Sequence, residues 1–240
     1  MERNVNLRIQ QPTMLGVNPT PREKLLYISR QLGLDLSKMQ GTSFNLFDTV
    51  LIQNSSSSRQ KMSFFTNTTN KSRNFTNFQN GTLQAGEAMI IEEISFVVLQ
   101  LSSSNLSSDA TNVVRVWNFS TAQYAGFLTN GSALSASMMN LSIANSVVIK
   151  NYNIIETNPM YNNRTTGINS VGVYNGNGVS IGESVIGNCV IKTESSPVLP
   201  MNQKLEVELE IPPVSVTSGN AAIMCVIGRF GCIFKARTTL

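Results

Sequence analysis

The chain has 240 residues, of which 41% are hydrophobic and only 13% are charged, with a formal net charge of +4. Soluble domains usually carry about 25% charged residues, so this chain must cover its exterior with Asn, Ser and Thr or bury part of it against neighbouring molecules. It contains no histidine, which excludes Ser-His-Asp and Cys-His catalysis and histidine metal sites. The length suits one large β domain or two small ones.

Basic residues concentrate in the first part of the chain, residues 1–43, which we expect to form an N-terminal arm with one short helix. The segment before Thr20 is polar, punctuated by proline and without a helical or strand period, so an extended conformation is expected. The basic residues singled out as candidate contacts to an interior, a genome or a membrane are Arg3, Arg8, Arg22, Lys24 and Arg30. The alternative is ordinary solvated charge.

A helix is predicted to begin after Thr20. Thr20 can cap the first turn, Pro21 suits the first helical position, and Glu23 can complete a capping box. Leucines and an isoleucine then form a narrow apolar stripe, and Gly33 is a natural end. Such a helix could cover the end of a β domain or bind a partner, and the pattern does not choose between these roles.

From Phe44 to the end, residues 44–240, the pattern is that of β-strands separated by turn sequences rich in Asn, Gly, Ser and Pro. Ten candidate strands are 44–52, 61–67, 88–101, 112–120, 123–130, 140–155, 168–175, 183–192, 204–211 and 220–236. Eight to ten strands with frequent turns predict an all-β domain, either a sandwich or a barrel.

The stretch 204–211, KLEVELEI, alternates glutamate with apolar residues at every position. Successive side chains of a strand point to opposite faces, so Glu206, Glu208 and Glu210 are predicted to share the solvent-facing side. A row of exposed carboxylates is a poor acid–base pair, and the only function we would consider for it is contact with a basic surface of another subunit.

Three stretches within the candidate strands, 88–101, 146–155 and 221–236, carry apolar residues on both faces. Burial on both faces requires something beyond the sheet, which could be a loop, a helix or a neighbouring subunit. This pattern favours a protein that assembles, although a thick core within one subunit could produce it too.

No motif indicates catalysis, a cofactor or a metal. The three aspartates form no calcium loop, and the glycines at 176, 178 and 182 miss dinucleotide-binding spacing. Cys225 and Cys232 lie in an apolar run and are predicted to be buried thiols, and Cys189 completes an odd number without a C-x-x-C pair. We therefore expect no enzyme activity and no cofactor. A secretory signal and a membrane span are not expected either.

Several stretches resemble jelly-roll major capsid proteins of small, tailless icosahedral bacteriophages, especially the lipid-containing kinds. They are LFDT at 46–49, SFFTN at 63–67, FTN at 75–77, LQAGEAMII at 83–91 and LPMNQKLEVELEIPP at 199–213. The resemblance covers roughly half of the chain. It implies a jelly-roll β-sandwich with the basic arm facing inward. A single roll is favoured over a compact double roll, because about ten strands are visible and two rolls of eight strands would be a tight fit.

The resemblance also implies a function. It implies a viral structural protein, without catalysis, that assembles with itself as trimers or pentamers and with other capsid proteins into an icosahedral shell. The arm could then meet phosphates of the genome or of an internal membrane. The expected location is the virion, and the host cytoplasm during assembly. The alternatives are a vertex or spike protein that binds a receptor through a β-sandwich, and, less favoured, a carbohydrate-active enzyme on a jelly roll.

Overall fold

The computed structural model describes most of the chain outside the first 18 residues. The described residues are 19–43, 45–55, 57–78, 81–118, 126–129, 134, 136–154, 190–193, 196–228 and 230–234. The candidate strand 168–175 lies outside them, as do Arg3, Arg8 and Cys189. The first elements are α1 (Pro21–Leu32), a short 3-10 helix (Leu36–Lys38), β1 (Met39–Thr42), β2 (Leu46–Leu51), β3 (Gln60–Phe64), β4 (Glu87–Ile90), β5 (Glu93–Leu101) and β6 (Val113–Asn118). They are followed by β7 (Leu128–Thr129), β8 (Met138–Ile143), β9 (Ser146–Asn153), β10 (Val190–Lys192), β11 (Val198–Leu199), β12 (Leu205–Ile211), β13 (Ser215–Val216), β14 (Asn220–Ile227) and β15 (Phe230–Phe234).

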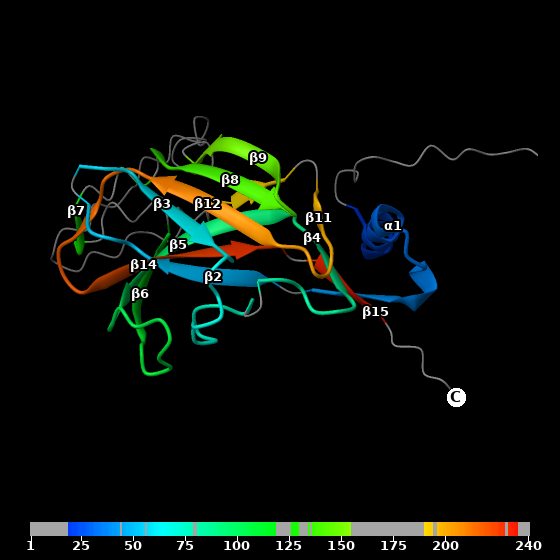
Figure 1. The fold of residues 1–240 in the computed structure, drawn as a ribbon, viewed down its shortest axis with the longest axis horizontal. Coiled ribbons are helices and arrows are strands. Elements are labelled where there is room, and N and C mark those ends of the chain that lie inside the picture. The colour runs from blue at the N-terminus through cyan, green and yellow to red at the C-terminus, as the bar shows by residue number, and fades with distance from the viewer. Residues whose placement is uncertain are drawn as a thin grey trace, which may run out of the picture.

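The predicted all-β fold is confirmed. Two antiparallel sheets form a sandwich: a first sheet with the order β10-β5-β14-β2, to which β6 adds beside β5, and a second sheet with the order β3-β12-β8-β9. Alternate residues of β5, β12 and β14 are buried in one core, which both sheets share. An outer sheet, β1-β15-β4-β11, extends beyond one end of the sandwich and carries α1 (Figure 1).

The eight sandwich strands pair in a nested order along the chain. The first pairs with the last (β2 with β14), the second with the seventh (β3 with β12), the third with the sixth (β5 with β10), and the fourth with the fifth (β8 with β9). All four pairs are antiparallel. The described strands are therefore arranged like one long hairpin of four strand pairs. The pairs β2–β14 and β5–β10 lie in the first sheet, and the pairs β3–β12 and β8–β9 lie in the second.

The helix α1 begins and ends as predicted. The Thr20 side chain accepts a hydrogen bond from the Glu23 backbone N–H, Glu23 accepts from the Thr20 backbone N–H at 2.7 Å, and Gly33 ends the helix in the left-handed region. The Glu23 carboxylate accepts hydrogen bonds from the Thr20 backbone N–H and from the Thr20 hydroxyl, and these bonds, the backbone one foremost, lower its pKa. Tyr27 and Ile28 are buried against the outer sheet, so the helix covers a β-sheet of its own chain.

Replacing Thr20 by alanine is expected to lower the free energy of unfolding of α1 by about 1 kcal/mol, because one orphan N–H of the first turn loses its acceptor. The substitution Thr20→Ser keeps the hydroxyl and is the matched control. Hydrogen exchange of the α1 amides measures the effect. Equal protection in the alanine variant and the wild type would contradict a stabilising role for the cap.

Three long candidate strands are shorter in the structure than the sequence pattern predicted. The described residues of 140–155 fall largely in the hairpin β8–β9, whose two-residue turn, Ala144 and Asn145, has positive φ angles of 52° and 66°, as tight hairpin turns require. Residues 88–101 divide into β4 and β5, and residues 220–236 divide at Gly228. Apolar content did not reveal these breaks, because apolar residues stand within a few positions on both sides of each of them.

Candidate assembly surfaces

The structure leaves two apolar edge strands in the sandwich. Among the described strands β6 pairs only with β5, and β9 pairs only with β8. Seven large hydrophobic side chains of the described residues are exposed, and five of them lie on these two strands. They are Val113, Val114, Val116, Val147 and Val148. Edge strands with exposed valines are the places where a second chain can add to a sheet.

The two edges differ in how they are protected. β9 carries Lys150 and two irregularities in its ladder with β8, and Asn151 has a positive φ of 52°. Bulges and lysines are the usual means by which edge strands avoid pairing. β6 has one irregularity in its ladder with β5 and a single charged residue, Arg115, and the side chains of Val114 and Val116 are 56% and 59% exposed. Of the two, β6 is the less protected edge.

The second face of β5 and β14 is covered by loops of the same chain. Leu99, Leu101 and Ala222 are buried under Phe75, with Leu106 packed beside them. The sequence left open whether a loop, a helix or a neighbouring subunit would cover this face, and here it is the segments around residues 65–78 and 102–111. The apolar pattern of these strands therefore gives no argument for a subunit contact, and the exposed valines of the edges are a separate observation.

The edge of β2 that does not pair with β14 is covered by the segment around residues 71–77. A buried ion pair holds this segment in place. The Asn77 side chain accepts a hydrogen bond from the Phe47 N–H and donates one to a carbonyl at the start of β2. Next to it, Lys71 Nζ lies 2.8 Å and 2.9 Å from the two carboxylate oxygens of Asp48, which is fully buried. Sequence reasoning missed this pair. The available signal was one acid in the apolar run LFDTVL.

The basic residues predicted as interior contacts are distributed as follows. Arg22 and Arg30 are exposed on α1. Lys24 lies 2.5 Å from Glu92, with both side chains mostly buried, and its Nζ lies 5.2 Å from the centre of the Phe230 ring. Arg22 and Arg30 therefore remain available to an external partner, whereas Lys24 serves a contact within the chain.

The glutamate row of β12 lies on the outer face of the second sheet, as predicted. Leu205, Val207, Leu209 and Ile211 are buried, and the three glutamates between them are partly exposed. Glu208 lies 3.3 Å from Lys61 of β3, and Glu210 lies 3.4 Å from Arg59. These partners belong to the same chain, so the row is largely neutralised without another subunit.

The cavities and thiols of the described residues do not point to a catalytic site. An open hollow of about 290 Å³ lies beside the β8–β9 turn, with Thr66, Ser142 and Lys204 in its wall. Burial raises the pKa of Cys225 well above its usual value, helped by the charge of Asp48, and raises that of Cys232 to about 11. Both thiols are buried, as predicted, and protonated at neutral pH, so they are poor nucleophiles.

The described part of the chain also lacks a metal cluster and a membrane-spanning helix. There, no three His, Cys, Asp or Glu side chains gather closely enough to hold a metal ion, and no helix has the length and apolarity to cross a bilayer. Comparison of the whole chain with protein-family models, with curated proteins and with solved structures finds no match.

Proposed function

We propose that this chain is a structural subunit that assembles with itself into the icosahedral shell of a virus, and that its sandwich is a single jelly roll. The nested strand pairing supports this proposal most strongly. Eight strands that pair first with last and inward to the fourth with fifth, four in each sheet with β6 as a fifth strand of the first, are the pairing expected of a jelly roll, an architecture used by viral capsid proteins. Jelly rolls also serve lectins and other proteins, so assembly needs its own support.

Support for assembly comes from the β6 edge. Val114 and Val116 are exposed beside backbone N–H and C=O groups that no described strand pairs with, and only Arg115 interrupts the apolar stretch. A second copy that pairs along this strand would satisfy the backbone groups and remove the valines from water. The low charge of the chain, 13%, is consistent with an exterior that is partly covered by neighbours.

We further propose that Arg22 and Arg30, with Arg3 and Arg8 of the arm, face the interior of the shell. Exposed guanidinium groups bind phosphates of nucleic acids or of lipid headgroups. The role requires no catalysis and no cofactor. Assembly would take place in the host cytoplasm and the product would be the virion.

The double substitution Val114→Lys/Val116→Lys is expected to reduce the assembled fraction at least 10-fold, since two ammonium groups at a strand edge oppose pairing. The pair Ser104→Lys/Ala110→Lys adds the same charge at exposed positions of the preceding loop and should assemble like the wild type. Sedimentation and negative-stain imaging of all three proteins measure the effect.

The wild-type result tests the function and the variants test the surface. Closed particles, or regular trimers or pentamers, from the wild type support a shell subunit. A wild type that is monodisperse as a monomer at micromolar concentration would contradict it and favour a receptor-binding sandwich. If the wild type assembles and both double variants assemble equally well, assembly is retained and the β6 edge is wrong.

A further inference from the structure

The outer sheet is a continuation of the first sandwich sheet. The outer sheet has the order β11-β4-β15-β1, and the first sandwich sheet has the order β10-β5-β14-β2. Strands at the same position in the two orders are consecutive in the chain: β11 follows β10, β4 precedes β5, β15 follows β14, and β1 precedes β2. All four strands are interrupted between the two sheets, between Ile90 and Glu93 in one strand and between Ile227 and Phe230 in the next. We call this line of interruptions the junction.

The strand formed by β4 and β5 has an extra residue at the junction. Ile227 lies opposite Ile94, and Phe230 lies opposite Ile90, so three steps along one strand match four along the other. Between β1 and β2 on the other side, Thr42 lies opposite Gly231 and Leu46 opposite Ile227, with no such difference. An extra residue in one strand is a β-bulge, which bends the strand and interrupts its ladder. Here it falls at Ile91–Glu92.

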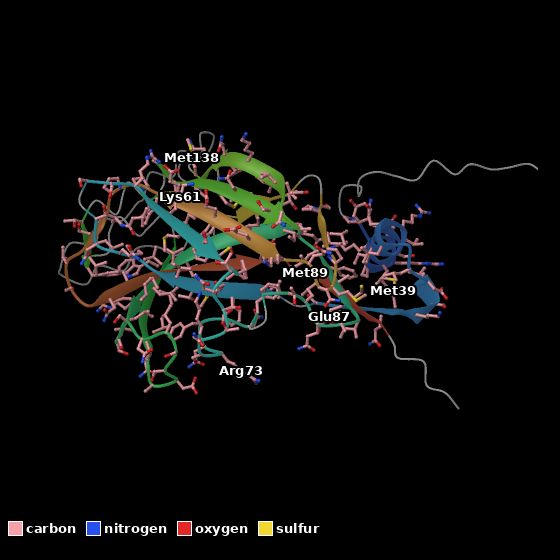
Figure 2. The ribbon with its side chains drawn as sticks, viewed as in Figure 1. Met39, Lys61, Arg73, Glu87, Met89 and Met138 are labelled. Carbon is pink, nitrogen blue, oxygen red and sulfur yellow. The ribbon has the colours of Figure 1, made fainter. Side chains whose placement is uncertain are left out.

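Separate cores lie on the two sides of the junction. The sandwich core takes in Met89 of β4 and Leu199 of β11 from the outer sheet, whereas Ile90 and Phe230 pack with Tyr27 and Ile28 of α1 in a smaller core. Figure 2 shows Met89 between the sandwich and Met39, which lies beside α1. The outer sheet and α1, which we call the α1 unit, therefore have an apolar core of their own.

Among the described residues, one ion pair connects α1 to the junction. Of the five ion pairs between described residues, only that of Lys24 with Glu92 joins the α1 unit to the bulge, with 2.5 Å between Nζ and a carboxylate oxygen. Lys24 belongs to the first turns of the helix and Glu92 to the bulge itself, so the pair fixes the helix relative to the place where the sheet bends. Phe230 lies under the same ammonium group.

We propose that the junction is a hinge between the sandwich and the α1 unit, and that the Lys24–Glu92 ion pair is the latch that selects one hinge angle. The interrupted ladder and the separate α1 core allow the α1 unit to turn as a body about Met89 and Leu199, the two buried side chains by which its strands enter the sandwich core. Without the ion pair the unit samples more than one angle. In an assembly of identical copies, such a hinge lets α1 meet neighbours at different angles while the sandwich stays unchanged.

The test measures a distance across the junction. Spin labels on Arg30→Cys of α1 and Lys150→Cys of β9, both exposed positions, report the angle by pulsed electron resonance. Cys189 is replaced by serine, and labelled protein is diluted with unlabelled protein so that distances are within one chain. The full chain gives a narrow distance distribution. Lys24→Met is expected to at least double its width or to add a second population.

Lys61→Met is the matched control, because it removes the same charge from an ion pair with Glu208 on the sandwich surface, and its distribution should overlay the wild type. Hydrogen exchange of the α1 amides is measured on the same samples. An unchanged distribution in Lys24→Met overturns the hinge. Broadening accompanied by loss of α1 amide protection also overturns it, since α1 would then be unfolding instead of turning. These outcomes are independent of whether the chain forms a shell.

Discussion

Lys71→Met is expected to lower the free energy of unfolding by about 3–5 kcal/mol, the usual effect of removing one partner of a buried ion pair. The Asp48 carboxylate is fully buried and faces the sandwich core opposite Cys225. Both of its oxygens accept hydrogen bonds from the Lys71 ammonium group, and one of them also accepts the Phe65 N–H at 2.7 Å. Methionine has a similar length but leaves the buried charge without its cation.

Lys61→Met provides the matched control for this prediction. Lys61 is also paired with a carboxylate, that of Glu208, but its side chain is 66% exposed, compared with 13% for Lys71. Surface pairs contribute about 0–1 kcal/mol. Urea unfolding followed by circular dichroism, at one fixed protein concentration for all variants, measures both effects. Equal losses of unfolding free energy in the two variants would mean that Asp48 is more accessible to solvent than its burial indicates.

A double variant separates the loss of the ion pair from the loss of packing by the lysine side chain. In Asp48→Asn/Lys71→Met the side-chain oxygen at position 48 can still accept the Phe65 N–H, and no charge remains buried. Most of the stability lost in Lys71→Met is therefore expected to return. If the double variant is less stable than Lys71→Met, the ion pair is not the cause of the loss. Position 71 would then matter for the fold of the 65–78 segment in another way.

Gly228→Ala is expected to cost about 2–5 kcal/mol of unfolding free energy, combining left-handed backbone strain with overpacking. Gly228 has a φ of 73°, and a Cβ there would lie 2.1 Å from Cε and 3.0 Å from Sδ of Met89. Met89 is flexible but fully buried, so its movement disturbs the sandwich core. The Gly228 N–H also donates to the carbonyl of Glu93, the first residue of β5, at 2.8 Å.

Gly33→Ala is the control for the backbone part of that loss. Gly33 has a φ of 65°, and nothing lies within 4 Å of the position of a Cβ, so only the strain of about 1–2 kcal/mol is expected. The difference between the two alanine variants then measures the clash with Met89. A double-mutant cycle with Met89→Ala checks the assignment: the cost of Gly228→Ala should fall toward that of Gly33→Ala. A cost that is unchanged by Met89→Ala would refute the steric cause.

Some elements could be predicted from the sequence because their causes are local. The limits of α1 follow from Thr20, Glu23 and Gly33, whose side chains or backbone act within one turn of the helix. The faces of β12 follow from strict alternation, since a strand with one wet face has period two. Burial of Cys225 and Cys232 follows from the apolar runs around them.

Other features could not be predicted because they depend on which segments meet. The β1 strand was assigned to the arm, since four residues with one glycine and two polar side chains carry no strand pattern, and it forms through pairing with β15. The same holds for β11 and β13, which have two residues each. The division of 88–101 into two strands depends on the register with β14 and β15, which only the sheet reveals.

The sequence by itself determined the all-β class of this protein, its one helix and the inward and outward faces of its regular strands. Each of these depends on the period of apolar residues or on contacts within a few residues. Only the tertiary structure decided the nested strand order, the Asp48–Lys71 pair, the junction with its Lys24–Glu92 contact, and which valines stay exposed. These features join residues that are far apart in the chain. Hydrophobicity drives such residues together without direction, so their pairing is fixed by register, packing and the burial of charge.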